Sequence, residues 1–336
     1  MRTAEHGAEP LRVVALGGGT GLPVVLRGFK TMLFADGGDD PDRLTAVVSV
    51  TDDGGSSGRL RSELGMLPPG DIRNCLVALS NNEPLMARLF QARYRAGASL
   101  EGHSVGNLIL AALAQEEGGS FLAAIRLASE VLNIQGRVLP LTLVPCHLVA
   151  RLTDGRLVSG ESAIARAGGV IDRLRIEPEA LPAAPGVVEA IEAADVVTLG
   201  PGSLFTSIVP NLLVASVRDA LVRSRALKVL VVNAMTEQGE TGGFTAADHV
   251  RAVHAHLGAP LLDAVMLPTD PIPDPVMDRY RGEGAVRVDP EDRDVDALVP
   301  LVLRRNLLQV GPKVRHDPML TVRAILEAHA ARQEVR

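Results

Sequence analysis

Two glycine-rich turns are the features of this sequence best suited to hold a ligand. The first is Gly17-Gly18-Gly19-Thr20-Gly21, and the second is Gly200-Pro201-Gly202-Ser203. Each follows an apolar run and precedes a segment with helical spacing. Such turns let backbone N–H groups approach phosphate oxygens, and the dipole of the following helix favours negative charge. The pair predicts a ligand whose diphosphate is held from both ends, or two ligands with one at each turn.

One isolated turn of this kind has a plain structural alternative, a tight connection between strand and helix without any ligand. Leu22 also stands where the strict dinucleotide fingerprint has its third glycine, which disfavours a hydride-transferring oxidoreductase. A second glycine turn in the same chain makes the binding interpretation the stronger of the two.

Polar residues follow two further apolar runs. Asp52 and Asp53 come directly after one of them and could accept a ribose hydroxyl or hold Mg²⁺. Paired aspartates also initiate turns, and that is the alternative for this pair. Asn233 ends another apolar run, and the loop Met235–Thr241 beyond it is typical of a lid or a specificity loop.

A third polar segment opens a helical pattern near residue 70. Asp71 is expected to cap that helix, with Arg73 and Asn74 in its first turn. The planar guanidinium of Arg73 is suited to bidentate phosphate recognition, and a surface arginine near a helix start is the alternative.

A fourth polar segment contains His103 and Asn107, at the start of an apolar helix. His103 could donate to a ligand or carry a proton, while a simple cap by Ser104 is the structural alternative. No acidic or nucleophilic partner for His103 can be assigned, so we predict no catalytic residues.

Alternating strands and helices must position these residues. Apolar runs rich in branched residues predict buried strands at Arg12–Leu16, Thr45–Val50, Asp195–Leu199 and Lys228–Val232. Helical spacing is found at Gly21–Phe34, Ile72–Ser80, Asn107–Gln115, Phe121–Leu132 and Met319–Gln333. The alternation predicts an α/β fold with a doubly wound, mostly parallel sheet. In such sheets ligands bind beyond the carboxyl ends of the strands, where the glycine turns and Asp52 would face one crevice.

Two other segments depart from this alternation. Leu141–Leu152 and Leu157–Ser162 predict an antiparallel hairpin at the sheet edge or in a small flap, because Asp154-Gly155 supplies the turn. Residues 268–275 carry four prolines, which predicts a rigid strap without helix. We expect a disordered tail over residues 1–10 and a single α/β domain with helical additions over residues 11–330.

Composition narrows the class of protein. The chain has 336 residues and a net charge of −6 without a basic stripe, which disfavours nucleic acid as a partner. No apolar run approaches the length of a membrane helix, and the polar start does not resemble a signal peptide, so we expect a cytoplasmic protein without a membrane partner. Cys75 and Cys146 are expected to be buried free thiols, and no metal site is predicted.

Taken together, the motifs resemble the YvcK/CofD-like family, and within it the YvcK branch of gluconeogenesis factors. The resemblance runs in order from about Val13 to Asp317. Its motifs are residues 17–22, 48–60, 69–74, 102–107 and 199–208.

The resemblance implies a Rossmann-like, CofD-like fold whose crevice binds a UDP-sugar, UDP-N-acetylglucosamine or UDP-glucose, with NAD(P) as an alternative occupant. It implies a regulator of cell shape and wall formation under gluconeogenic growth, with no required cofactor and a protein partner in wall precursor synthesis. Tyr280 and Arg315 match positions that hold the UDP-sugar in similar proteins. Tyr280 would contact uridine and Arg315 the diphosphate. Their alternatives are a packed surface tyrosine and a solvated arginine, and a homo-oligomer remains open.

The other branch of the family implies a different function. A CofD-type 2-phospho-L-lactate transferase would use Mg²⁺ to act on a deazaflavin precursor, with Asp52 and Asp53 holding the metal. One position departs from the family pattern: Pro318 stands where similar proteins carry a phosphorylated threonine, so regulation by phosphorylation at that position is excluded. Thr321 is a nearby hydroxyl that could substitute.

Overall fold

Seven parallel strands form the central sheet of the computed structural model, which describes residues 10–97, 99–311 and 313–335. Their order across the sheet is β10-β9-β8-β7-β1-β2-β3. The strands are β1 (Val13–Gly17), β2 (Leu44–Val48), β3 (Arg137–Pro140), β7 (Val196–Leu199), β8 (Leu227–Val231), β9 (Ala264–Pro268) and β10 (Leu301–Arg305). The four predicted strands are β1, β2, β7 and β8, with small shifts at their ends, and β3, β9 and β10 were missed.

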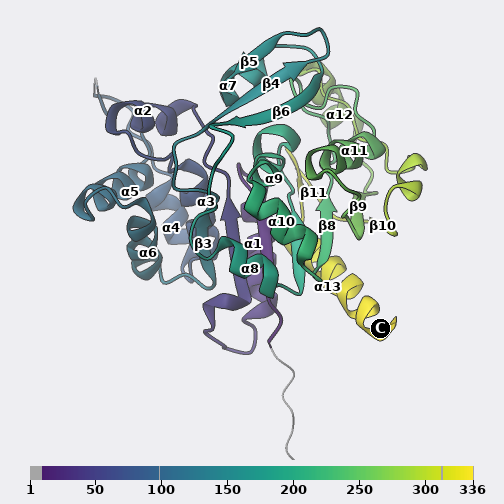
Figure 1. Cartoon of the computed structure of the whole chain (residues 1–336), viewed down its shortest axis with the longest axis horizontal. Coiled ribbons are helices and arrows are strands. Elements are labelled where there is room, and N and C mark those ends of the chain that lie inside the picture. Colours follow the sequence, from purple (N-terminus) through teal and green to yellow (C-terminus); the bar gives the residue numbers. More distant parts are fainter. Residues whose placement is uncertain (1–9, 98, 312, 336) are drawn as a thin grey trace, which may run out of the picture.

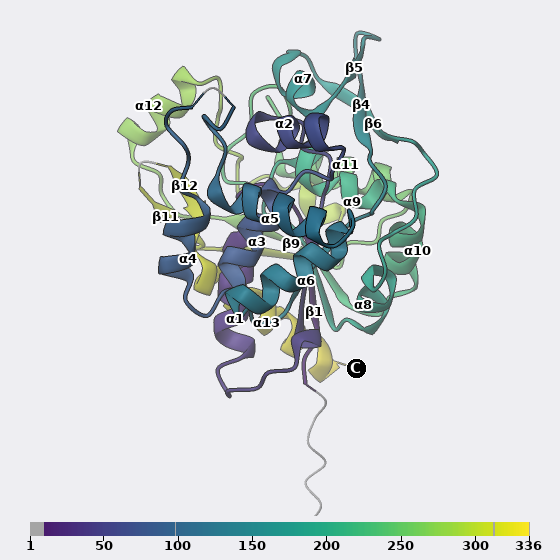
Figure 2. The same ribbon diagram turned by 90° about the vertical axis from the view of Figure 1, so that its left-hand side faces the viewer.

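Helices cover both faces of this sheet, which is why every residue of β1, β2 and β8 is buried. Figure 2 shows α1 (Leu22–Leu33) and α13 (Pro318–Val335) on one side and α8 (Val187–Ala193) and α10 (Ala215–Arg223) on the other. The remaining helices are α2 (Gly55–Leu64), α3 (Gly70–Leu79), α4 (Glu83–Phe90), α5 (Val105–Glu116), α6 (Phe121–Leu132), α7 (Glu161–Arg166), α9 (Pro210–Leu213), α11 (Ala246–Leu257) and α12 (Asp274–Gly282). The short turns are η1 (Pro41–Arg43), η2 (Leu204–Ile208) and η3 (Asp294–Ala297). The predicted doubly wound α/β fold is confirmed.

A small antiparallel sheet lies above the central one in Figure 1. It consists of β4 (His147–Leu152), β5 (Leu157–Ser159) and β6 (Ile171–Glu177), in the order β5-β4-β6, and we call it, with α7, the flap. The predicted hairpin and its turn are present, but its first strand begins at His147 rather than Leu141. Leu141 still belongs to the central sheet, because its amide donates to the Val48 carbonyl at 2.8 Å.

Near the C-terminus, the short hairpin of β11 (Leu308–Val310) and β12 (Val314–His316) packs beside α12. The Tyr280 hydroxyl of α12 accepts a hydrogen bond from the Val314 amide at 3.0 Å. The proline strap is extended up to Pro273, but a helix begins at Asp274, so the prediction of no helix through residue 275 was wrong. Proline is tolerated in a first helical turn because the N–H groups there need no helical partner.

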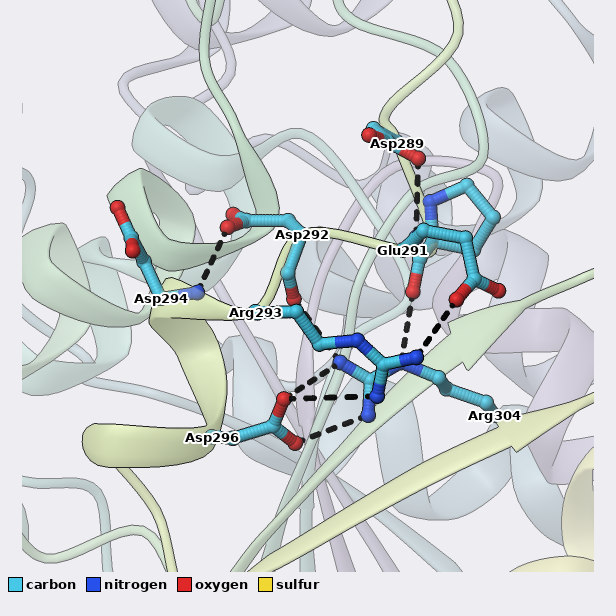
Figure 3. Close-up of polar contacts among 8 residues, drawn as sticks. Asp289, Glu291, Asp292, Arg293, Asp294, Asp296 and Arg304 are labelled. Carbon is cyan, nitrogen blue, oxygen red and sulfur yellow. Dashed lines mark hydrogen bonds and ion pairs between the residues drawn. The ribbon is translucent and has the colours of Figure 1, made fainter.

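One acidic segment is folded onto the edge strand β10. The Arg304 guanidinium donates to the carbonyls of Pro290 and Asp292 at 2.7 and 2.9 Å, and to both Asp296 carboxylate oxygens at 2.9 and 3.0 Å (Figure 3). These bonds hold the loop that precedes η3 against the sheet.

The predicted tail lies outside the described residues except for Pro10. In the part of the chain that the structure describes, no helix is both long and apolar enough to cross a membrane. Cys75 and Cys146 are buried free thiols, as predicted.

Candidate functional site

The two glycine turns lie side by side at the point where the winding of the sheet reverses. From β1 the chain adds β2 and then β3 on one side, and from β7 it adds β8, β9 and β10 on the other. β1 and β7 are neighbours, and each runs into one of the glycine turns. In open α/β sheets ligands bind in the crevice beyond the strand ends at this reversal.

The turns pack directly against each other. A Cβ atom added to Gly21 would lie 2.3 Å from the Pro201 carbonyl oxygen. Any residue other than glycine would therefore clash at this position. Gly200 has a φ of +77°, which also favours glycine. The turns therefore form one continuous backbone wall.

A pocket of about 300 Å³ opens beside this wall, and we call it the crevice pocket. The predicted ligand-binding residues that line it are Gly19, Thr20, Gly21, Gly202, Ser203, Asn233, Tyr280 and Arg315. The other lining residues are Val24, Pro201, Ala234, Met235, Thr236, Glu237, Leu308, Lys313, Val314 and His316. The remaining predicted residues, described below, do not line it.

The cationic side of the pocket comes from the hairpin of β11 and β12. Lys313 and Arg315 are exposed, and within the described part of the chain neither takes part in an ion pair. Two cations without internal partners beside a wall of glycine amides form a favourable site for a phosphate group.

A side chain of the protein occupies the start of η2, directly after the second glycine turn. Glu240 Oε2 accepts hydrogen bonds from the amides of Phe205 and Thr206 at 3.0 and 3.2 Å, and Oε1 accepts one from the Thr206 hydroxyl at 2.7 Å. Burial, with Glu237 nearby, raises the pKa of Glu240 to about 7. This carboxylate accepts from the first amides of η2, where the backbone dipoles favour an acceptor.

The first turn is partly filled in the same way. The Gly19 amide donates to Asp71 Oδ2 at 2.6 Å, and Asn74 Nδ2 approaches the Gly19 carbonyl at 3.5 Å. Burial raises the pKa of Asp71 to about 6, and Asp52 adds to the rise. Asp71 therefore does not cap α3 as predicted, because its carboxylate is turned toward the glycine turn. Gly18 lies against the same carboxylate, since a Cβ atom on it would be 2.9 Å from Asp71 Oδ2.

Arg73 is buried and joins α3 to α5 instead of facing the pocket. Its guanidinium donates to Ser104 Oγ at 2.5 Å, Asn107 Oδ1 at 2.6 Å and Asn74 Oδ1 at 2.9 Å. Burial lowers its pKa to about 10. All of its partners are neutral, and the side chain makes no contact with the crevice pocket in this structure.

His103 is buried beside the start of α2. Its Nδ1 lies 2.9 Å from Ser56 Oγ, and Asn107 Nδ2 donates to the same hydroxyl at 3.0 Å. Burial lowers the pKa of His103, with the Arg59 charge adding to the effect. Ser104 caps α5, because its hydroxyl accepts from the Asn107 amide at 3.3 Å.

Asp52 and Asp53 point toward backbone amides. Asp52 Oδ1 accepts from the Gly54 amide at 2.9 Å, and Asp53 Oδ1 accepts from the Ser162 amide of α7 at 2.8 Å. In the described residues no group of three or more His, Cys, Asp or Glu side chains is arranged to hold a metal ion. Each of these bonds uses one oxygen of the carboxylate, and the observed roles of Asp52 and Asp53 are to form a turn and to fix the flap.

The flap adds two further contacts. Glu161 Oε2 accepts a hydrogen bond from the Thr51 hydroxyl at 3.0 Å, and burial, together with Asp52 and Asp71, raises its pKa to about 9. A Cβ atom on Gly239 would lie 2.1 Å from the Ala165 carbonyl oxygen, so the loop after β8 touches α7.

Sequence reasoning missed Glu161, Glu237, Glu240 and Lys313. The loop that carries Glu237 and Glu240 had been singled out, but acidic residues in a loop carry no signal that they turn inward. Thr321, the hydroxyl nearest to Pro318, is fully buried on α13 and is not accessible to a modifying enzyme in this structure.

Comparison with known proteins agrees with this architecture. The family model described as 2-phospho-L-lactate transferase CofD matches residues 13–308. A "Gluconeogenesis factor" from Bacillus subtilis is 44% identical over 312 residues, covering 93% of this chain and 95% of the relative. One from Halalkalibacterium halodurans is 44% identical over 316 residues, covering 94% and 95%.

Solved structures give the same result. A crystal structure of a Bacillus halodurans protein is 43% identical with a TM-score of 0.89, covering 95% of this chain and all (100%) of that one. A second, described as a member of the UPF0052 family, is 42% identical with a TM-score of 0.88, covering 94% and 99%. The chain belongs to the CofD family, and within it to the YvcK group whose relatives are named gluconeogenesis factors.

Proposed function

We propose that the crevice pocket binds a UDP-sugar, UDP-N-acetylglucosamine or UDP-glucose, and that the protein acts as a ligand-responsive regulator. The observation that carries this proposal is the meeting of the double-glycine wall with Tyr280, Lys313 and Arg315 in one pocket. Amides and cations suit a diphosphate, and an aromatic ring suits a base. NAD(P) shares these groups and is the alternative occupant.

The internal carboxylates limit where the diphosphate would lie. Asp71 and Glu240 already use the amides of Gly19, Phe205 and Thr206. Thr20, Gly202 and Ser203 line the pocket and are not bound by either carboxylate. The diphosphate would therefore lie across the junction of the two turns, opposite Arg315.

Binding at this position would also reach other elements. The Tyr280 hydroxyl already ties α12 to the β11–β12 hairpin through Val314. A ligand that contacts Tyr280 and Arg315 together would favour one arrangement of these elements, which is sufficient for regulation. We infer from the names of the relatives a role in gluconeogenic growth. The family resemblance extends this proposal to the control of cell shape in the cytoplasm, with a protein partner in wall precursor synthesis.

Calorimetry tests this function directly. Purified protein would be titrated with UDP-N-acetylglucosamine, UDP-glucose, NAD and a deazaflavin precursor, each with and without Mg²⁺. We expect a UDP-sugar to bind with an affinity independent of Mg²⁺ and to raise the melting temperature by mass action. No heat and no thermal shift with any UDP-sugar at millimolar concentration would refute the proposal.

A second candidate function comes from the description of the matching family model, 2-phospho-L-lactate transferase CofD. In this alternative the protein would be a Mg²⁺-dependent transferase acting on a deazaflavin precursor. Asp52 and Asp53 each accept an amide hydrogen bond with one carboxylate oxygen, so the transferase would have to hold Mg²⁺ through their remaining acceptor positions. Incubation of the purified protein with Mg²⁺, a phospholactyl donor and the precursor tests this alternative. Product formation would establish the transferase activity.

A further inference from the structure

Glu237 is the only carboxylate among the described residues that line the crevice pocket. It is half-buried in the loop after β8 and shares the pocket with Lys313 and Arg315. The hydrogen-bond partners of its carboxylate are nevertheless neutral: the side-chain amide of Asn233 and the hydroxyl of Ser203, and neither of the two cations. A carboxylate held apart from two available cations does not serve to neutralise them.

The position of Glu237 is fixed by its neighbours. Asn233 Nδ2 donates to Glu237 Oε1 at 2.9 Å and to the Gly202 carbonyl at 3.0 Å, so one amide ties the carboxylate to the glycine wall. The Glu237 amide donates to Thr241 Oγ1 at 2.9 Å, which fixes the backbone. The Ser203 hydroxyl also hydrogen-bonds to the carboxylate. The group is therefore preorganised at the pocket wall.

A carboxylate has about four acceptor positions, and the protein donors described here do not fill them. A phosphate group would be repelled by Glu237, whereas hydroxyl groups would donate to it. We propose that Glu237 recognises a vicinal pair of hydroxyl groups on the ligand, whose diphosphate lies between the glycine turns and Arg315. This inference rests on the proposed function and assigns to Glu237 the specificity for the carbohydrate part of the ligand.

Protonation chemistry is consistent with this role. Burial raises the pKa of Glu237, and the hydrogen bond from Ser203 opposes that rise. Two further donors from a ligand would stabilise the ionised carboxylate.

In a UDP-sugar, vicinal hydroxyls occur on the ribose and on the sugar ring. The test therefore compares UDP-N-acetylglucosamine, UDP and 2′-deoxy-UDP by calorimetry against wild type and Glu237→Gln, which keeps the shape of the side chain. If the ribose is recognised, wild type prefers UDP to 2′-deoxy-UDP and the variant loses that preference. If the sugar ring is recognised, the variant loses only the preference for UDP-N-acetylglucosamine over UDP. Either result supports the proposal, with an expected loss of about tenfold or more in affinity.

Glu116→Gln is the matched control, because Glu116 is exposed at the end of α5 and does not line the pocket. Circular dichroism and thermal melting establish that both variants are folded. Wild-type binding of all three ligands with unchanged affinities in Glu237→Gln would overturn this inference alone, and so would an equal weakening of all three. Absence of binding to wild type would overturn the proposed function, and this inference with it.

Discussion

Glu240 and Thr206 are joined by two hydrogen bonds, one from the Thr206 amide and one from its hydroxyl, which engage both oxygens of the carboxylate. Through this pairing, a loop that follows β8 supplies the negative charge at the start of η2. The chain that leaves the second glycine turn is thereby stabilised by a carboxylate of the protein itself, and the crevice pocket lies beside it.

Replacing Glu240 by alanine would leave two buried amides and one hydroxyl without their acceptor. We expect the free energy of unfolding to fall by about 3 kcal/mol, because buried donors that lose their partner cost about 1–3 kcal/mol each and part of the loss relaxes. Denaturant unfolding measures it. Glu240→Gln retains one acceptor oxygen and should lose less; equal stability of Glu240→Ala and wild type would contradict the structure.

Glu161 should give the protein a characteristic pH dependence. Its pKa is about 9 in the folded protein against an ordinary value of 4.5, so the folded state holds more protons between these values. The free energy of unfolding therefore falls as pH rises through this window.

Glu161→Gln cannot ionise and should become progressively more stable than wild type from about pH 5 to about pH 9. Unfolding curves across this range, with Glu116→Gln as the control for a lost surface charge, check the prediction. A difference between Glu161→Gln and wild type that does not change with pH would show that Glu161 ionises normally.

Arg315→Ala should strongly weaken UDP-N-acetylglucosamine binding while leaving the unliganded melting temperature nearly unchanged. Arg315 is exposed and, in the described structure, without an ion pair, so its loss removes no internal contact. Charge-assisted hydrogen bonds to a diphosphate predict a loss of at least about tenfold in affinity. Arg323→Ala, at an exposed arginine on α13 that does not line the pocket, is the control. Normal binding by a folded Arg315→Ala would remove Arg315 from the site.

Arg73→Ala should have the opposite effect. Arg73 donates to Ser104, Asn107 and Asn74 in the interior, so its loss should destabilise the protein by about 3 kcal/mol. Ligand affinity of the folded variant should stay unchanged, since Arg73 does not line the pocket. Paired unfolding and calorimetry experiments separate the two effects, and lost binding at wild-type stability would return Arg73 to the ligand site.

The sequence predicted four of the five interior strands because buried parallel strands are continuous apolar runs, as in β1 and β8. The fifth, β9, is buried in the same way but was missed. β3 and β10 were harder to identify because they are edge strands with half-buried or exposed residues. The two glycine turns could be placed at one crevice because each follows a parallel strand, and the carboxyl ends of parallel strands lie at the same edge of the sheet.

The direction of individual side chains could not be predicted. Arg73 and His103 have residue types suited to a ligand, yet both face the interior between helices. Glu240 has a residue type suited to the surface, yet it lies 6% exposed against a helix start. Such choices depend on contacts between segments far apart in the chain, which spacing alone does not specify.

The contact between Gly239 and Ala165 joins the flap to the loop whose earlier residues line the crevice pocket. A side chain at position 239 would need the space now filled by the backbone of α7. Two hydrogen bonds connect the same short helix to the turn after β2. The Ser162 amide donates to the Asp53 carboxylate, and the Thr51 hydroxyl donates to the Glu161 carboxylate. We expect a displacement of the loop that carries Glu237 and Glu240 to affect α7 and, through it, the turn after β2.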